Sequence, residues 1–239
     1  MLTTTEGIVL SSLRYNDSDL IVKCYTKSHG ILSFIVKGVL KSRKGKFKTS
    51  YFQVFSLLTI HCLVKNKTQL NYFKDVQPAV HLSSIQSNVY KGTLAMFISE
   101  VVKSVIYEEE QNEELYRFLK NSILWLDRSD NFSNFHLSFL TKLTSYIGFY
   151  PSPKKEASDV FFSLRDGHFL PYEDKFCLNE EYSSILKQLI SMEASDYQTL
   201  HIDKVQRRKM LEILLHYYEL HVENFKIPKS LDVLKSVFN

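Results

Sequence analysis

The side chains best suited to chemistry in this sequence are cations gathered in one short segment. Residues 37–48, the basic segment, contain six basic side chains and no acidic one, namely Lys37, Lys41, Arg43, Lys44, Lys46 and Lys48. Two glycines and a serine in the same stretch favour a loop over a helix. Mobile cations beside small residues suit the phosphate backbone of a nucleic acid, and Phe47 offers a ring for stacking on a base. The alternative is a solvated loop without a ligand.

A second basic cluster lies on a helix predicted near the C-terminus. Arg207, Arg208 and Lys209 are consecutive, and Lys204 precedes them by about one helical turn. These cations lie beside an apolar helix face that includes Leu211. The cluster can bind DNA or an acidic peptide, or it can be the solvated side of an amphipathic helix, and both interpretations stay open.

Patterns typical of catalysis or metal binding are weak. The eight histidines are scattered, and His216 and His221, five residues apart on a predicted helix, lie on different faces. The glycines of the basic segment lack the spacing of a phosphate-binding loop. The three cysteines are too far apart in sequence for a zinc ribbon or a disulfide framework. We therefore expect no enzymatic activity, no metal and no cofactor.

Charge is distributed unevenly along the chain. Residues 1–80 contain 12 Lys and Arg against 4 Asp and Glu, whereas residues 81–239 contain 18 against 22. A basic first third indicates contact with a polyanion. The sequence shows neither a signal-peptide pattern nor an apolar stretch of about 18 residues, and its cysteines suit a reducing compartment. A cytoplasmic protein without a membrane span is expected.

The secondary-structure elements that must position these residues change from strands to helices along the chain. Strands are predicted near residues 7–10, 19–26, 30–37, 51–64 and 69–76. Five strands favour a small closed or nearly closed barrel, and the OB-fold is the commonest barrel of this size. The number of strands alone does not separate it from an SH3-like barrel.

After Pro78 the apolar periodicity becomes helical. Ser83 or Ser84 is predicted to cap the first of several helices, which are expected near residues 89–107, 113–126, 132–147, 179–190, 204–225 and 229–238. An Asp-Gly turn predicts a hairpin between them. The predicted fold is therefore α+β. A five-stranded OB-fold β-barrel domain spans residues 1–79, and an α-helical domain with a small β-hairpin insertion near 160–171 spans residues 80–239.

Short motifs along the chain, taken together, resemble one known family. In the N-terminal third they are EGIVL at residues 6–10, RYNDSD at residues 14–19 and VKG at residues 36–38; weaker matches are GFYP at residues 148–151, the aromatic hairpin at residues 161–170, and KSLDVL at residues 229–234. This pattern is similar to the RecO family of bacterial recombination and repair mediators, and the resemblance covers most of the chain.

The resemblance implies an OB-fold followed by a helical domain, binding of single- and double-stranded DNA, and annealing of complementary strands. The implied partners are RecR and the acidic C-terminal tail of the single-stranded-DNA-binding protein, and RecA is then loaded indirectly. Arg14 would join the basic segment in contacting DNA, and helix residues 204–211 would bind the acidic tail. Many members carry a four-cysteine zinc module after the Gly-x-x-Pro element, whereas here that region contains only Cys177. One thiolate cannot form such a site, so the hairpin must be held by its own packing.

The resulting hypothesis is that the protein acts by binding and charge neutralisation and not by catalysing a reaction. The cations of the barrel neutralise phosphates on two strands so that the strands can pair, while the helical part binds a protein partner. Two alternatives from other classes stay open: a protein-interaction adaptor whose barrel binds no DNA, and a hydrolase or nuclease without a recognisable motif.

Overall fold

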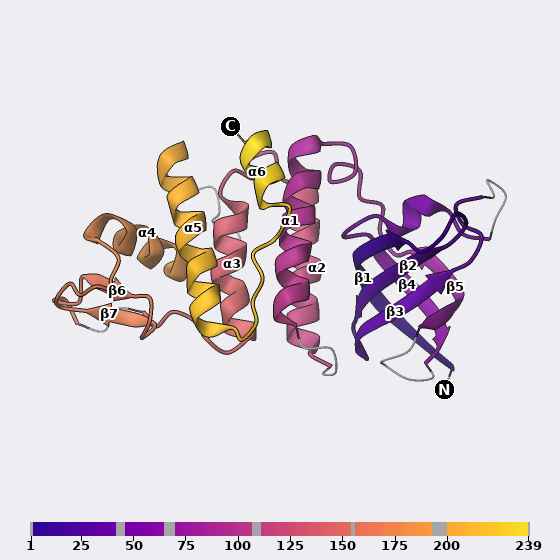
Figure 1. The fold of residues 1–239 in the computed structure, drawn as a ribbon, viewed down its shortest axis with the longest axis horizontal. Coiled ribbons are helices and arrows are strands. Elements are labelled where there is room, and N and C mark those ends of the chain that lie inside the picture. The colour runs from indigo at the N-terminus through magenta and orange to yellow at the C-terminus, as the bar shows by residue number, and fades with distance from the viewer. Residues whose placement is uncertain are drawn as a thin grey trace. The chain divides into compact units, whose positions relative to one another are not determined.

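The N-terminal part of the chain is built from strands in the computed structural model, which describes residues 2–41, 46–64, 70–106, 111–153, 156–192 and 200–238. The strands of this part are β1 (Leu2–Arg14), β2 (Leu20–Thr26), β3 (Gly30–Val36), β4 (Leu57–Leu63) and β5 (Asn71–Pro78) (Figure 1). They form a closed barrel in the order β1-β2-β3-β5-β4, with β4 returning to β1. The predicted five-stranded OB-fold barrel is confirmed.

One contact in this barrel is parallel. Phe34 is the register partner of Asn71 and Ile35 of Tyr72 where β3 meets β5, whereas the other neighbouring strands are antiparallel. The parallel contact covers only these two residue pairs. β4 lies in the barrel wall between β5 and β1, so the connection from β3 to β4 must pass β5, and this crossing sets the OB-fold apart from a simple meander.

The apolar run in β1 is continuous because both faces of the strand are covered. Ile8, Val9 and Leu10 are each at most 1% exposed. Val9 belongs to the core inside the barrel, and the Leu10 carbonyl accepts a hydrogen bond from the Ser99 hydroxyl of α1 (Val89–Val105). A strand covered on both sides loses the apolar–polar alternation of a half-exposed strand.

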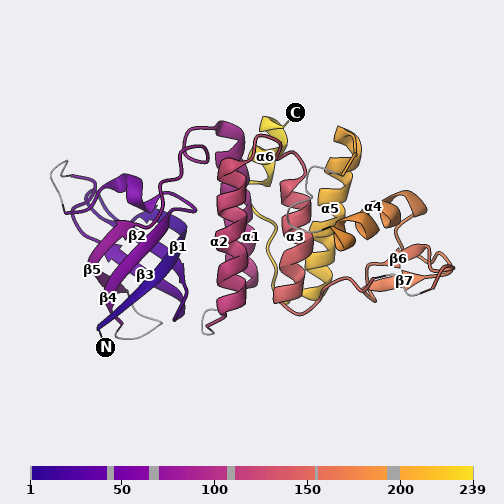
Figure 2. The same ribbon diagram turned by 180° about the vertical axis from the view of Figure 1, so that it is seen from behind.

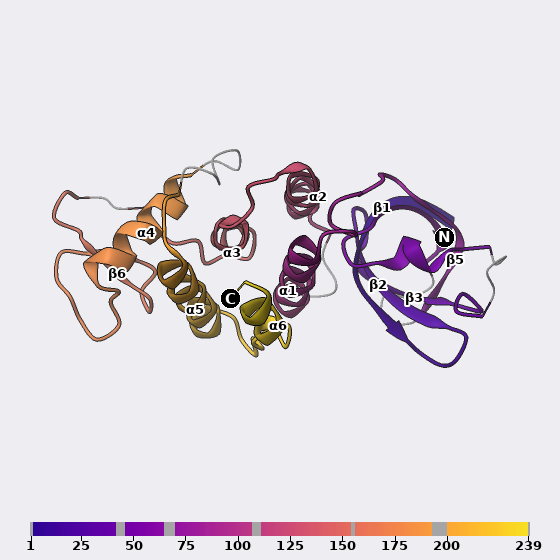
Figure 3. The same cartoon turned by 90° about the horizontal axis from the view of Figure 1, so that it is seen from above.

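Two helices cover the β1 and β2 side of the barrel. Seen from above, α1 and α2 (Glu113–Arg128) lie beside β1 and β2, and β3 and β5 lie on the opposite side (Figure 3). Lys120 of α2 forms an ion pair with Glu6 at 3.0 Å. The Tyr25 hydroxyl donates a hydrogen bond to the Asn112 carbonyl at 3.2 Å. The outward side chains Tyr72 and Lys74 of β5 are exposed, whereas β3 is buried except at Ser33, so the β5 side is the barrel face left uncovered.

The long strand predicted over residues 51–64 is wrong in its first half. Residues Thr49–Phe52 form a 3-10 helix, and the strand begins only at Leu57. Phe52 is 1% exposed in the barrel core, and Phe55 is 2% exposed with a positive φ of 67°. Phe52 belongs to the core inside the barrel, and Phe55 is buried without being part of a strand, so apolar composition alone imitates that of a strand here.

The predicted cap of the first helix is also wrong. The Asn88 side chain caps α1 by accepting hydrogen bonds from the Tyr90 and Lys91 backbone N–H groups. The backbone N–H groups of Ser83 and Ser84 instead donate to the Asp127 carboxylate near the end of α2. Asp127 therefore holds the segment between β5 and α1.

The chain divides into two compact units, Met1–Arg128 with Pro228–Asn239, and Ser129–Ile227. Besides the barrel, α1 and α2, the first unit contains α6 (Leu231–Val237), which packs on α1. The boundary predicted between residues 79 and 80 falls just after β5, and the division into domains at that point stays a prediction. None of the described helices is long and apolar enough to cross a membrane.

The second unit combines helices with the predicted hairpin. Its elements are α3 (Phe135–Tyr146), β6 (Phe161–Ser163), β7 (His168–Leu170), α4 (Glu180–Ser191) and α5 (Lys204–His221). Figure 2 shows α3 running beside α5. Helix α5 ends four residues earlier than predicted, and Asn224 beyond it has a left-handed φ of 58°, which a continuing helix does not allow.

The hairpin is held by aromatic packing, as the sequence required. The Phe162 ring lies 5.1 Å from the Phe169 ring and 5.8 Å from the Tyr217 ring of α5, between centroids. The Phe162 N–H donates to the Ser183 hydroxyl of α4 at 2.9 Å. The hairpin is thus tied to two helices of its unit by contacts that involve no cysteine.

Removing the Asp127 carboxylate is expected to destabilise the first unit. Asp127→Ala leaves the Ser83, Ser84 and Ile85 N–H groups without their acceptor, and we expect a loss of about 1–3 kcal/mol in the free energy of unfolding. Asp127→Asn keeps one acceptor oxygen and should cost less. Denaturant unfolding measures the effect, with the exposed Asp130→Ala as the matched control. Equal stability of the two alanine variants would contradict this role.

A buried histidine makes the stability of the second unit depend on pH. His136 is 4% exposed, and burial, assisted by the positive charge of Arg207, lowers its pKa to about 3. An unfolded chain binds this proton near pH 6.5, so unfolding is favoured as the pH falls below that value. Between pH 6.5 and 5 the parent should lose about 1–2 kcal/mol more than His136→Gln. Urea unfolding across this range tests it; the exposed His81→Gln should behave like the parent.

Candidate nucleic-acid interface

The basic segment begins at the end of β3, on the uncovered side of the barrel. Lys37 and Lys41 are exposed at its start, and Lys46 and Lys48 are exposed before the 3-10 helix. Arg43 and Lys44 lie outside the described residues. Arg14 is exposed at the end of β1, where its register partner is Leu20.

The start of the basic segment is fixed by a carboxylate of the β1–β2 turn. Asp19 accepts hydrogen bonds from the Gly38 N–H at 2.8 Å, the Ser18 hydroxyl at 2.7 Å and the Asn16 amide at 2.9 Å. These bonds, led by that of Gly38, lower the pKa of Asp19 below its usual value. The Leu40 N–H also donates to the Ser18 carbonyl at 2.9 Å. The β1–β2 turn and the first cations of the segment are therefore held together.

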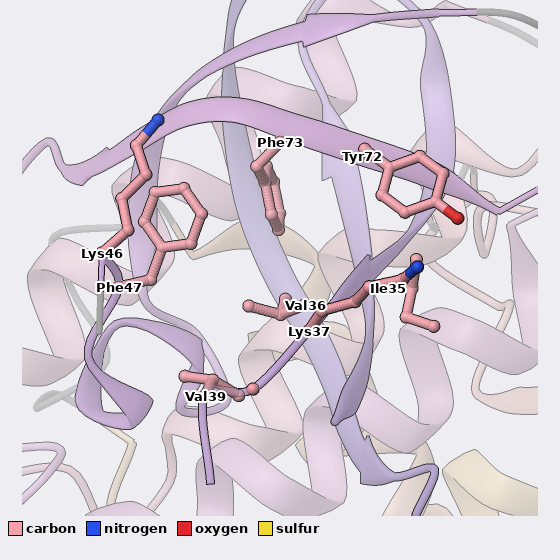
Figure 4. A pocket seen from close by; sticks show the side chains of 9 residues that line it. Ile35, Val36, Lys37, Val39, Lys46, Phe47, Tyr72 and Phe73 are labelled. Carbon is pink, nitrogen blue, oxygen red and sulfur yellow. The ribbon is translucent and has the colours of Figure 1, made fainter. Parts of the chain in front are cut away.

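A hollow of about 270 Å³ lies between β3, β5 and the basic segment (Figure 4). We call it the aromatic hollow; its lining residues are Ile35, Val36, Lys37, Gly38, Val39, Lys46, Phe47, Tyr72 and Phe73. Lys46 and Phe47 lie at one end, Lys37 and Tyr72 at the other, and Phe73 stands between them (Figure 4). An apolar lining with a cation at each end suits a flat apolar group that carries negative charge on both sides.

Phe47 packs on the barrel. Its ring meets Phe52 at 6.4 Å and Phe73 at 6.2 Å, edge to face in both cases, and it is partly buried against the core. Phe47 thus anchors the returning part of the basic segment. Its stacking on a base stays a prediction.

Tyr72 is a candidate that the sequence reasoning missed. Its side chain is 49% exposed, and the Lys37 ammonium lies 5.5 Å from the centre of its ring. Tyr72 and the exposed Lys74 alternate with the buried Asn71 along β5, so they point outward from the barrel. Side chains alternate between the inside and the outside of the barrel along β5, and this two-residue period is the sequence signal that could have identified Tyr72 and Lys74 as outward-facing.

Lys46 is less available than the other cations of the segment. Its ammonium lies 3.7 Å from the Asp75 carboxylate and donates a hydrogen bond to the Lys74 carbonyl. Within the described residues, Lys41 and Lys48 have no ion pair. The positive charge offered to a ligand is therefore concentrated on the unpaired lysines.

The second predicted cluster is only partly available. Leu211 is 5% exposed in the core of its unit, so it has little surface to offer a partner. Arg207 donates hydrogen bonds to the Asn134 side chain at 2.8 Å and the Ile202 carbonyl at 3.3 Å. The remaining cations of the cluster are exposed on α5: Lys204, Arg208 and Lys209. Whether they bind a partner stays a prediction.

Potential metal ligands are dispersed in the part of the chain that the structure describes. No three His, Cys, Asp or Glu side chains there come together as a metal site. Cys24 and Cys62 are buried in the barrel core, where burial raises the pKa of both thiols. Cys177 is a free thiol beside the hairpin.

Loss of the Asp19 carboxylate is expected to release the start of the basic segment. In Asp19→Ala the Gly38 N–H loses its acceptor, and its hydrogen exchange should accelerate about tenfold, as for one lost hydrogen bond. Since the pKa of Asp19 is lowered in the folded protein, its stabilisation is present above about pH 3.9 and is lost as the pH falls below it. Exchange measured by NMR tests this, with Asp17→Ala as the control; identical exchange in both variants would contradict it.

Comparison with known proteins places both parts of the chain in one family. Residues 1–80 match the family described as recombination protein O N terminal, and residues 86–231 match recombination protein O C terminal. Similar bacterial proteins named DNA repair protein RecO include those of Flavobacterium johnsoniae, 39% identical over 240 residues, and Phocaeicola vulgatus, 36% identical over 246 residues. Each comparison covers 100% of both chains. The chain therefore belongs to the recombination protein O (RecO) family.

Proposed function

We propose that this protein is a non-enzymatic mediator of DNA repair and homologous recombination. Its barrel binds single- and double-stranded DNA and anneals complementary strands. The observation that carries the proposal is the group of exposed lysines around the aromatic hollow, on the side of an OB-fold barrel that α1 and α2 leave uncovered. OB-folds commonly bind nucleic acids on an open barrel face.

The proposed mechanism rests on charge neutralisation. Two complementary strands repel each other through their phosphates, and lysines that contact both backbones lower this repulsion. Binding also releases the counterions condensed on the DNA, which makes the affinity dependent on salt. With about six phosphates neutralised, the logarithm of the affinity should fall against the logarithm of the salt concentration with a slope near −4 for single strands.

Partner binding extends this proposal. The family membership supports RecR as a partner, and RecA as the protein loaded onto single strands with its help. The exposed cations of α5 are candidates for the acidic C-terminal tail of the single-stranded-DNA-binding protein. These activities belong in the cytoplasm, where a bacterial chromosome is repaired.

Neutralising three lysines should weaken both the salt dependence and annealing. In the triple variant Lys37→Ala, Lys41→Ala, Lys48→Ala, the slope for single strands should become less steep by about 2, at about 0.7 per phosphate contact. Annealing of complementary oligonucleotides at low salt should slow in the same variant. The exposed Lys187, Lys226 and Lys229, replaced together by alanine, give a control with the same change in charge.

The same measurements separate the alternative functions. A protein-interaction adaptor would show no DNA binding in the parent and unchanged partner binding in the triple variant. Cleavage of labelled DNA with Mg²⁺ or Mn²⁺ that persists through further purification would instead indicate an enzyme. If the triple variant and its control show equal salt slopes for single strands, the basic segment is not part of the DNA interface.

A further inference from the structure

We infer that the aromatic hollow is a subsite for one unstacked nucleobase, whose ring stacks on Tyr72. This inference rests on the DNA binding proposed above. It adds a property that charge neutralisation alone does not supply, namely a preference for strands whose bases are free.

The hollow exists because β3 and β5 separate early. Their parallel contact ends after Ile35 and Tyr72, and no further register pair joins them. Beyond this point Gly38 has a φ of 70°, a left-handed conformation that turns the chain away from β5. The apolar side chains between the diverging strands are therefore left without a neighbouring strand over them.

The floor of the hollow is rigid. The Phe73 ring stacks on Phe34 at 4.1 Å with an interplanar angle of 13°, and on Phe52 at 5.6 Å with an angle of 20°. Val36 and Val39 beside it are 2% and 6% exposed. Because these side chains are fixed by the barrel core, the hollow is preformed, and a ligand loses little free energy in ordering it.

Tyr72 forms a wall of the hollow from the solvent side. Nearly half of its side chain is exposed, although it stands beside apolar lining residues. Such a ring gains from contact with a second flat π-system, and base–aromatic stacking tolerates any base. The volume of about 270 Å³ lies just below the range of about 300–1,000 Å³ typical of small-molecule sites, which suits a single ring system.

The charges at the two ends identify the ring as a base of a nucleic acid. Lys37 stands at the Tyr72 end and Lys46 at the Phe47 end (Figure 4). A base within a strand has a phosphate on either side, so both ends of the hollow can meet negative charge. The exposed pair of Lys46 with Asp75 contributes little free energy, so a phosphate can replace the carboxylate.

The subsite distinguishes single strands from duplexes. Bases in a duplex are paired and stacked on one another, whereas bases of a single strand can turn outward onto a protein ring. Loss of one base–aromatic stack should weaken single-strand binding about 5- to 100-fold. Duplex binding, which depends on the phosphates, should change less than about twofold.

Tyr72 variants test the subsite against strands with and without bases. The probes are oligothymidylate and an abasic strand of the same length, which carry the same phosphates. The parent should bind oligothymidylate about 5- to 100-fold more tightly than the abasic strand. This ratio should approach one in Tyr72→Ala, be retained in Tyr72→Phe, and stay unchanged in Tyr172→Ala, a similarly exposed tyrosine of the second unit. The salt slope should be the same in all four proteins.

The outcomes separate this inference from the proposed function. If the parent binds DNA and Tyr72→Ala keeps the full ratio between the two strands, the subsite is refuted while DNA binding stands. An equal loss of single-strand and duplex affinity in Tyr72→Ala would also refute it, because the ring would then support the barrel rather than a base. If the parent retains neither form of DNA at low salt, the proposed function fails and the subsite fails with it.

Discussion

Closure of the barrel through β1 is the constraint on which the other features depend. Residues 2–8 of β1 pair with β4, residues 7–14 pair with β2, and an irregularity near Leu10 bends the strand between its two partners. The outer side of the same strand is covered by α1. One long strand therefore joins the barrel to the helices, and the exposed side chains of β5 lie on the other side of the barrel, where we propose that DNA binds.

The uncovered face combines features that would be unfavourable without a ligand. Like charges follow one another closely in the basic segment, and a half-exposed tyrosine borders an apolar hollow. The basic segment is nevertheless held at both ends. Asp19 binds its first part through the Gly38 N–H, and Phe47 packs its last part against Phe52 of the barrel core. The side chains that fix the segment thus differ from the exposed lysines that we propose to contact DNA.

The sequence was sufficient for the barrel, the hairpin and the approximate positions of the helices, because each has a clear apolar periodicity or turn. It failed where apolar residues are buried outside a strand, as at Phe52 in the barrel core and at the buried Phe55. At the interface, residue type alone identified the cations. The positions of Tyr72 beside Lys37, and of Asp75 beside Lys46, follow from contacts between segments far apart in the chain, which no local pattern specifies. For Leu211, periodicity correctly placed an apolar helix face, but that face belongs to the core.

The short parallel contact between β3 and β5 has a mechanical consequence. A closed barrel resists strand-to-strand association with other molecules because its strands have no free edge. Its resistance to opening is set by the pair of neighbouring strands with the shortest contact, here the seam between β3 and β5. With only two residue pairs, this seam is where thermal fluctuations separate the strands most easily. A ligand in contact with both strands would hold them together, so the proposed binding of DNA on this face should also make the barrel more rigid.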